Sequence, residues 1–79
     1  MIAKAAILKN KLVYTGNSGD RHHHIIHAQP PGFFKGGDCV QGFVTDGGEF
    51  LNRELSAIHA FECGQINRNK AMLFSEDLW

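Results

Sequence analysis

Along positions 40–45, Val40, Gly42 and Val44 alternate with Gln41, Phe43 and Thr45, and this period of two predicts a β-strand. The three residues that follow, Asp46, Gly47 and Gly48, tolerate positive φ angles, which a tight hairpin turn requires. A second short strand is expected over residues 49–51. The stretch therefore predicts a β-hairpin, and two aromatic residues, Phe43 and Phe50, lie on its two arms.

A helix is predicted immediately after this hairpin. Asn52 is a good N-cap, because its side chain can accept a hydrogen bond from the free N–H groups of a helix start. Gly64 is a natural residue just past a helix end, so the helix should span residues 53–63. Apolar residues recur near helical spacing and are expected to face the sheet: Leu55, Ala57, Ile58 and Phe61. The outer side should then hold Arg53, Glu54, Ser56 and Glu62.

The N-terminal half predicts a second hairpin and a short helix. Residues 2–8 are apolar apart from Lys4, residues 11–15 can form the partner strand, and the turn is expected at positions 9–10. A helix over residues 21–29, capped by Ser18 or Asp20, must end at the two prolines at 30–31. The fold expected is α+β, a single domain (residues 1–79) in which a small antiparallel β-sheet has one or two helices packed on it. Trp79 is expected to dock on this domain.

The length and the net charge of the chain limit the classes of partner that it can bind. A chain of 79 residues removes only about 60% of its unfolded surface from water, so a homo-oligomer is expected to complete the burial. The chain has 8 basic residues (Lys and Arg) and 8 acidic residues (Asp and Glu). This absence of a basic excess argues against non-specific binding to long DNA or RNA. The chain contains no run of 18 apolar residues, so no membrane-spanning helix is predicted. Cys39 and Cys63 form no CxxC motif and are expected to be free thiols in an intracellular protein.

The histidines allow two interpretations. His23 and His27 are four residues apart, as are His59 and Cys63, and two such pairs facing each other would make a zinc site. Surface histidines on a small helix are the stronger interpretation, so neither a metal nor another cofactor is expected. A separate hypothesis places an anion at the start of this helix, held by Arg21 and His22 (residues 21–22).

Several residues of the second half suit a nucleotide ligand. Phe43 and Phe50 are either core residues or platforms on which a purine stacks. Such stacking contributes about 1–3 kcal/mol per base to binding. Asn52 can read an adenine edge, although capping the helix is the stronger interpretation. Arg68 and Lys70 either lie in a solvated loop or clamp phosphates.

Catalytic motifs are poorly represented. The chain has no Gly-x-Ser-x-Gly motif, no phosphate-binding Gly-rich loop and no Ser-His-Asp order. A small enzyme that degrades a cyclic nucleotide, with His22 or His23 as the base, is therefore the weaker hypothesis. A protein–protein inhibitor of a host factor, anchored by Phe33, Phe34 and Trp79, is a further alternative.

Sequence blocks spread from Lys4 to Trp79 add a resemblance. The best defined are Gln-Gly-Phe-Val-Thr at 41–45, Phe-Leu-Asn-Arg at 50–53 and Ser-Glu-Asp-Leu-Trp at 75–79. With them go Lys-Ala-Ala-Ile at 4–7, Val-Tyr-Thr-Gly at 13–16, Arg-His-His at 21–23 and Gly-Gln-Ile at 64–66. This pattern resembles the phage-encoded Thoeris anti-defence sponges, which sequester cyclic ADP-ribose signals in the bacterial host cytoplasm.

The resemblance implies binding without catalysis, by a homodimer or a higher homo-oligomer that holds the signal between protomers. The ligand would be a cyclic ADP-ribose isomer or a cyclic oligonucleotide. Phe43 and Phe50 would flank its base or ribose, Asn52 would hydrogen-bond to it, and Arg68 or Lys70 would meet its pyrophosphate. Arg21 and His22 would form a second anion site. The chain departs from the pattern in its Pro-Pro and Phe-Phe pairs at 30–34 and in its histidines at 24–27.

Overall fold

The first two strands form a hairpin with a two-residue turn. The computed structural model describes residues 1–34 and 39–78. In it β1 (Ile2–Lys9) pairs antiparallel with β2 (Leu12–Thr15). Asn10 and Lys11 have φ angles of 49° and 67°, as a tight turn between twisted strands requires. The predicted hairpin is confirmed, with its turn one residue later than expected because Lys9 still pairs with Leu12.

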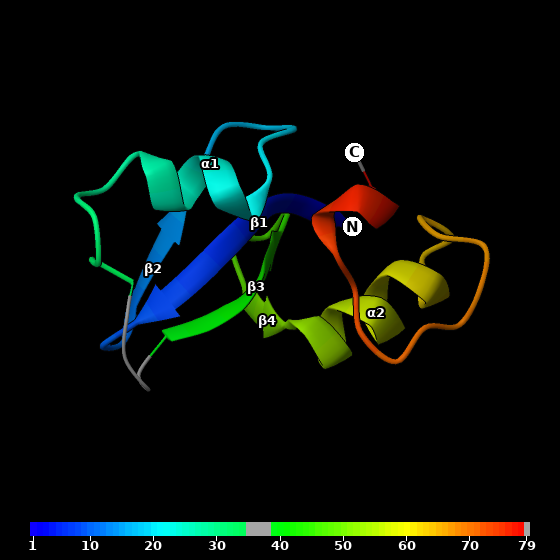
Figure 1. Ribbon diagram of the computed structural model, residues 1–79. Coiled ribbons are helices and arrows are strands. Elements are labelled where there is room, and N and C mark those ends of the chain that lie inside the picture. Colours follow the sequence, from blue (N-terminus) through cyan, green and yellow to red (C-terminus); the bar gives the residue numbers. More distant parts are fainter. Residues whose placement is uncertain (35–38, 79) are drawn as a thin grey trace.

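Two further strands complete a four-stranded antiparallel sheet in the order β2-β1-β3-β4 (Figure 1). β3 (Cys39–Thr45) pairs with β1 on one side and with the short β4 (Phe50–Asn52) on the other. Gly48, with a φ of 86°, lies in the turn between β3 and β4, and the backbone N–H of Thr45 donates to the carbonyl of Glu49 at 2.9 Å. The predicted hairpin and the α+β class are confirmed.

The helix α2 (Arg53–Glu62) begins and ends at the predicted signals. The side-chain oxygen of Asn52 accepts a hydrogen bond from the Leu55 N–H at 2.9 Å, which confirms the N-cap. Gly64 has a φ of 78° and turns the chain away after the last helical residue.

The helix α1 (His22–His27) is shorter than predicted, and its cap is a different residue. Arg21 is the N-cap, and its backbone N–H donates to Nδ1 of His24 at 2.9 Å. The predicted capping by Ser18 or Asp20 is wrong: the Asp20 carboxylate instead accepts from the Asn17 N–H at 2.9 Å and stabilises the turn before the helix. A 3₁₀ helix, η1 (Ser75–Asp77), follows the long loop after α2.

The core lies on one face of the sheet. The strand register places Ala5 and Phe43 opposite each other on that face. Ile25 of α1 and Ala57 and Ala60 of α2 pack into the same cluster, which Leu73 completes. Figure 1 shows α1 near the β2 and β1 end of the sheet and α2 beside β3 and β4.

The predicted buried side of α2 is confirmed for Ala57 and wrong for the three larger residues. Leu55 and Ile58 are each 50% exposed and Phe61 is 42% exposed, whereas Ser56 and Ala57 are fully buried. Small residues face the sheet because Phe43 already supplies the bulk of the core there. The Ser56 hydroxyl is satisfied by donating to the Leu51 carbonyl at 3.1 Å.

The sequence also predicted the absence of a membrane-spanning helix, two free thiols and the docking of the C-terminal residue Trp79. No helix in the described parts of the chain is long and apolar enough to cross a bilayer. Cys39 is half-buried, Cys63 is exposed, and both are free thiols. The expected docking of Trp79 lies outside the described residues.

Candidate functional site

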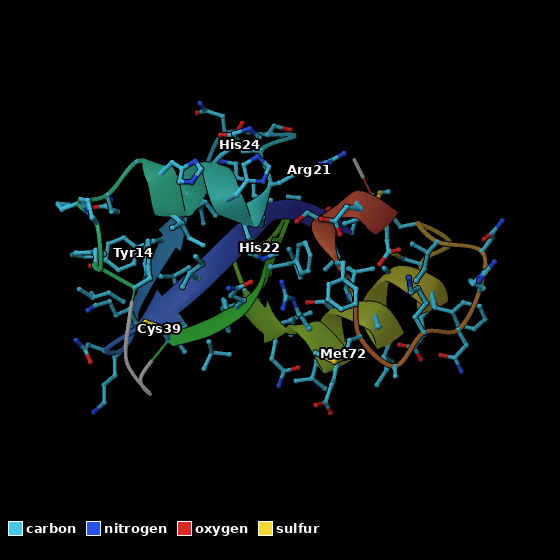
Figure 2. The ribbon with its side chains drawn as sticks, in the orientation of Figure 1. Tyr14, Arg21, His22, His24, Cys39 and Met72 are labelled. Atoms are coloured by element: carbon cyan, nitrogen blue, oxygen red, sulfur yellow. The ribbon has the colours of Figure 1, made fainter. Side chains whose placement is uncertain are left out.

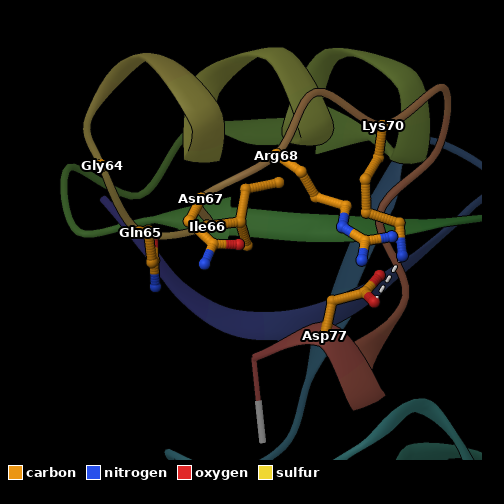
Figure 3. A pocket seen from close by; sticks show the side chains of 7 residues that line it. All are labelled: Gly64, Gln65, Ile66, Asn67, Arg68, Lys70 and Asp77. Carbon is orange, nitrogen blue, oxygen red and sulfur yellow. Dashed lines mark hydrogen bonds and ion pairs between the residues drawn. The ribbon is translucent and has the colours of Figure 1, made fainter.

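A polar groove lies between the loop that follows α2 and the 3₁₀ helix η1 (Figure 3). Its volume is about 550 Å³, within the range of about 300–1,000 Å³ that small-ligand pockets occupy. We refer to it as the loop groove. It is lined by Gly64, Gln65, Ile66, Asn67, Arg68, Lys70 and Asp77.

Hydrogen bonds hold the wall of the loop groove that follows α2. The backbone N–H groups of Gln65 and Ile66 donate to the Ala60 carbonyl at 2.8 and 3.3 Å. The Gln65 side chain accepts from the Ile2 N–H at 2.7 Å and donates to the Ile2 carbonyl at 2.8 Å. Both ends of this amide are therefore used to fasten the loop to β1, and Gln65 positions the groove.

Two cations and one carboxylate give the loop groove its charge. Lys70 Nζ lies 2.5 Å from Asp77 Oδ1, and Asp77 Oδ2 accepts from the Phe74 N–H at 2.8 Å. Burial raises the pKa of Asp77, but hydrogen bonds from Lys70 and Phe74 and the positive charges of Lys70 and Arg68 outweigh it, so the pKa is lowered overall. Asp77 thus stays ionised, Arg68 is exposed, and the lining carries one net positive charge.

Arg68 and Lys70 are the predicted site residues that the structure brings together, and both line the loop groove. The side chains of Arg68, Lys70 and Asp77 converge in Figure 3. Of the groove residues that sequence reasoning missed, Asp77 has the clearest physical role. It lies seven residues after Lys70, and nothing in that spacing predicts that η1 folds back so that Asp77 contacts Lys70.

The predicted stacking role of Phe43 is wrong. Its side chain is 0% exposed, and its ring packs edge-on against that of His22 at 5.0 Å between centroids. The register also separates the two phenylalanines: Phe43 pairs with Leu51, whereas Phe50 pairs with Val44. They therefore lie on opposite faces of the sheet and cannot flank one ligand.

The predicted anion contact by His22 is also wrong, because this residue is part of the interior. His22, labelled in Figure 2, is 5% exposed. Its Nε2 lies 2.7 Å from the Gly42 carbonyl and its Nδ1 2.9 Å from the Ser75 hydroxyl. A carbonyl can only accept, so Nε2 carries the proton and Nδ1 accepts from Ser75. Burial lowers the pKa of His22; the hydrogen bond to Gly42 opposes this, but the net shift is downward.

Arg21, Asn52 and Phe50 lie elsewhere. Arg21 is the half-buried N-cap of α1 and does not line the loop groove. Asn52 uses its side-chain oxygen to cap α2, so that oxygen is already engaged and a bidentate contact to an adenine edge would compete with the cap. Phe50 is half-buried on the sheet face opposite the core.

The alternative zinc site does not form. Within residues 1–34 and 39–78, no three His, Cys, Asp or Glu side chains lie close enough to hold a metal ion. His23 and His27 do neighbour each other on α1, with ring centroids 6.0 Å apart. At the C-cap of α2, the Cys63 thiol instead lies 3.7 Å from the Ala60 carbonyl.

Comparison with known proteins gives one family. Neither the curated proteins nor the solved structures contain a match to the chain. A family match covers residues 1–79, and on this basis the chain belongs to the phage T4 y16D protein family.

Proposed function

We propose that this phage-family protein binds and sequesters a small anionic signal derived from a nucleotide, and that the loop groove holds it. The observation that carries the proposal is the convergence of Arg68 and Lys70 on one polar groove of about 550 Å³. The ligand class is a cyclic ADP-ribose isomer or, as a second possibility, a cyclic oligonucleotide made by a bacterial host in defence. The protein would then act in the host cytoplasm.

The groove chemistry suits a pyrophosphate attached to ribose. The guanidinium of Arg68 is planar and can donate two parallel hydrogen bonds to a phosphate. Lys70 offers a point charge that is now shared with Asp77 at 2.5 Å and can be shared with a ligand anion. The amide of Asn67 adds a donor and an acceptor for ribose hydroxyl groups.

The same lining supports binding without turnover. The seven residues around the loop groove include no histidine, cysteine or serine that could act as a base or nucleophile. Asp77 is held by Lys70 and has a lowered pKa, which makes it a weak base. His22, the base considered for an enzyme, is buried with both ring nitrogens engaged.

A second candidate function rests on an apolar hollow of about 530 Å³ at the end of α1. Phe33 and Phe34 line it, and both pack edge-on against Tyr14, with centroids 5.4 and 5.5 Å away. Rigid aromatic side chains around an apolar hollow are common at protein interfaces. This hollow supports the alternative of a protein–protein inhibitor.

The test is a depletion assay. The protein is incubated with cyclic ADP-ribose isomers and a panel of cyclic oligonucleotides, separated by filtration, and heated to release what it holds. The proposal expects one ligand to leave solution and to return chemically intact. Arg68→Ala should reduce the depletion, and Lys11→Asn, which removes a cation from the first hairpin turn but accepts positive φ, should not.

The other outcomes of this assay contradict the proposal in different ways. A ligand that returns cleaved would make the protein an enzyme and direct attention to His23, which is exposed. If no ligand is depleted, the nucleotide hypothesis fails and the hollow at Phe33 and Phe34 becomes the surface to study. Equal depletion by Arg68→Ala and by the unmodified protein would remove the loop groove from the site.

A further inference from the structure

The loop groove places a carboxylate beside its cations. Among the residues that line it, Asp77 is the acidic one, and it faces the two basic ones, Arg68 and Lys70. Figure 3 shows the Asp77 carboxylate turned towards the ends of both basic side chains. A phosphate bound by these cations would lie close to the carboxylate, and the two negative charges would repel each other. Asp77 therefore weakens the binding of any ligand that offers the groove nothing but negative charge.

The Asp77 carboxylate is held in place from its own side of the groove. Its Oδ2 accepts a hydrogen bond from the Phe74 N–H at 2.8 Å, which closes the turn of η1. Ser75, at the start of η1, is joined to the buried His22 at 2.9 Å. Lys70 contacts Oδ1 at 2.5 Å from the end of a flexible four-carbon stem. When an anion enters, Lys70 is thus the partner that can turn towards it, and the carboxylate stays at the groove.

The carboxylate can still accept further hydrogen bonds. An ionised carboxylate has about four lone-pair sites, two on each oxygen. The contacts with Lys70 and Phe74 occupy one site on each oxygen, so each oxygen has one site left. The Asp77 side chain is 21% exposed and lines the groove. A ligand group that donates a hydrogen bond can therefore reach it, whereas a group that only accepts is repelled.

A sugar phosphate offers both groups that this arrangement requires. Its phosphate accepts hydrogen bonds from Arg68 and Lys70. Its hydroxyl groups, a few bonds away, can donate to Asp77, and acidic side chains bind ribose hydroxyl groups in this way in dinucleotide sites. A hydrogen bond to an ionised acceptor is stronger than one to a neutral amide such as that of Asn67. The hydroxyl contact therefore offsets the repulsion that Asp77 imposes on the phosphate.

We infer that Asp77 is the specificity-determining residue of the loop groove, and that it selects phosphate esters with sugar hydroxyl groups over phosphate esters without them. The inference deepens the proposed function and rests on it, because the loop groove must first bind an anion. It names the ligand class as a ribose phosphate that enters with its hydroxyl groups towards η1. Simpler anions of the cell are disfavoured at the same site.

Two probes that differ only in their hydroxyl groups test the inference. Ribose 5-phosphate and methyl phosphate are both monoesters, and both carry two negative charges at about pH 8. Backbone amide signals of the ¹⁵N-labelled protein, followed by NMR during each titration, give the two affinities. The unmodified protein should bind ribose 5-phosphate about tenfold or more tightly than methyl phosphate, as a hydrogen bond to a charged acceptor provides.

Asp77→Asn should remove most of this preference. The amide oxygen can still accept from the Phe74 N–H, but the negative charge is gone. Methyl phosphate should then bind more tightly than it does to the unmodified protein, and the preference for ribose 5-phosphate should fall to about threefold or less. Glu49→Gln is the matched control, because it removes the same charge from an exposed residue outside the loop groove. That variant should keep the preference of the unmodified protein.

Equal affinities for the two esters in the unmodified protein, or a preference that persists in Asp77→Asn, would overturn the inference and leave the anion groove standing. If neither ester binds to either protein, the loop groove holds no phosphate, and the proposed function fails together with the inference. Should Asp77→Asn not fold, the ¹³C signal of the Asp77 carboxyl group in the unmodified protein decides. It should shift further with ribose 5-phosphate than with methyl phosphate, and equal shifts would overturn the inference.

Discussion

The imidazole Nδ1 of His22 lies 2.9 Å from the hydroxyl of Ser75, a residue 53 positions later in the chain. The other ring nitrogen binds the Gly42 carbonyl at 2.7 Å. One buried side chain thus joins the start of α1, the middle of β3 and η1. Because Asp77 belongs to η1 and lines the loop groove, His22 acts on the candidate site by positioning one of its walls.

Replacing this histidine should destabilise the fold. His22→Phe keeps a ring of similar size but leaves the Gly42 carbonyl and the Ser75 hydroxyl without a partner, and each unsatisfied buried group costs about 1–3 kcal/mol. His23→Phe, at the exposed neighbouring position, should change the free energy of unfolding by less than about 0.5 kcal/mol. Urea unfolding of both variants measures the difference. Similar losses in the two variants would contradict the role assigned to His22.

The stability of the protein should depend on pH through His22. Its pKa is lowered in the folded state from about 6.5, so just below that pH the unfolded chain binds a proton that the folded chain does not. The free energy of unfolding should therefore be highest above about pH 6.5 and fall as the pH decreases, by at most about 1.4 kcal/mol per pH unit for this one proton. Urea midpoints at several pH values measure the slope, and His22→Phe should reduce it. An unchanged slope in that variant would show that other groups cause it.

Gly42 should tolerate no side chain. A methyl group there would collide with the Leu51 carbonyl oxygen and come within 2.9 Å of the Phe50 ring. Gly42→Ala should cost about 1–3 kcal/mol or more, because the backbone of β4 must move. Gly47→Ala is the matched control: its methyl group would meet only the Thr45 hydroxyl, at 3.7 Å. Thermal melts compare the two variants, and equal melting temperatures would contradict the packing described for β3 and β4.

Arg68 and Lys70 should differ in what they contribute. Arg68→Ala should leave the melting temperature unchanged, because the side chain is exposed, and should weaken ligand binding about tenfold or more, because a hydrogen-bonded ion pair is lost. Lys70→Ala should weaken binding and also reduce stability by up to about 1 kcal/mol, because it removes the partner of Asp77. Titration calorimetry and thermal melts of both variants separate the two effects. Normal binding by both would exclude this loop from the site.

The sequence predicted those parts of the fold that depend on neighbouring residues. The turn at 46–48, the Asn52 cap and the Gly64 end of α2 each follow from the conformation of one or two residues. They were therefore confirmed nearly to the residue. The proximity of Arg68 and Lys70 in one groove belongs to the same class, because two positions separate them in the chain.

Contacts between distant segments could not be predicted in this way. On α2, helical periodicity favoured Leu55 and Ile58 as core residues, but the side of the helix that packs into the core cluster carries Ala57 and Ala60. His22 was predicted to contact an anion because the sequence did not show that both of its ring nitrogens are engaged. Its partners, Gly42 and Ser75, come from the distant elements β3 and η1. Both errors arise because tertiary packing overrides local preference.

The most direct test of the account is to titrate the ¹⁵N-labelled protein with cyclic ADP-ribose and follow the backbone amide signals by NMR. We predict that the largest shifts cluster at Asn67, Arg68, Lys70 and Asp77, and that the ligand is recovered unchanged at the end of the titration. Shifts confined to Phe33 and Phe34, or no shifts in the presence of excess ligand and of the cyclic oligonucleotides, would contradict it.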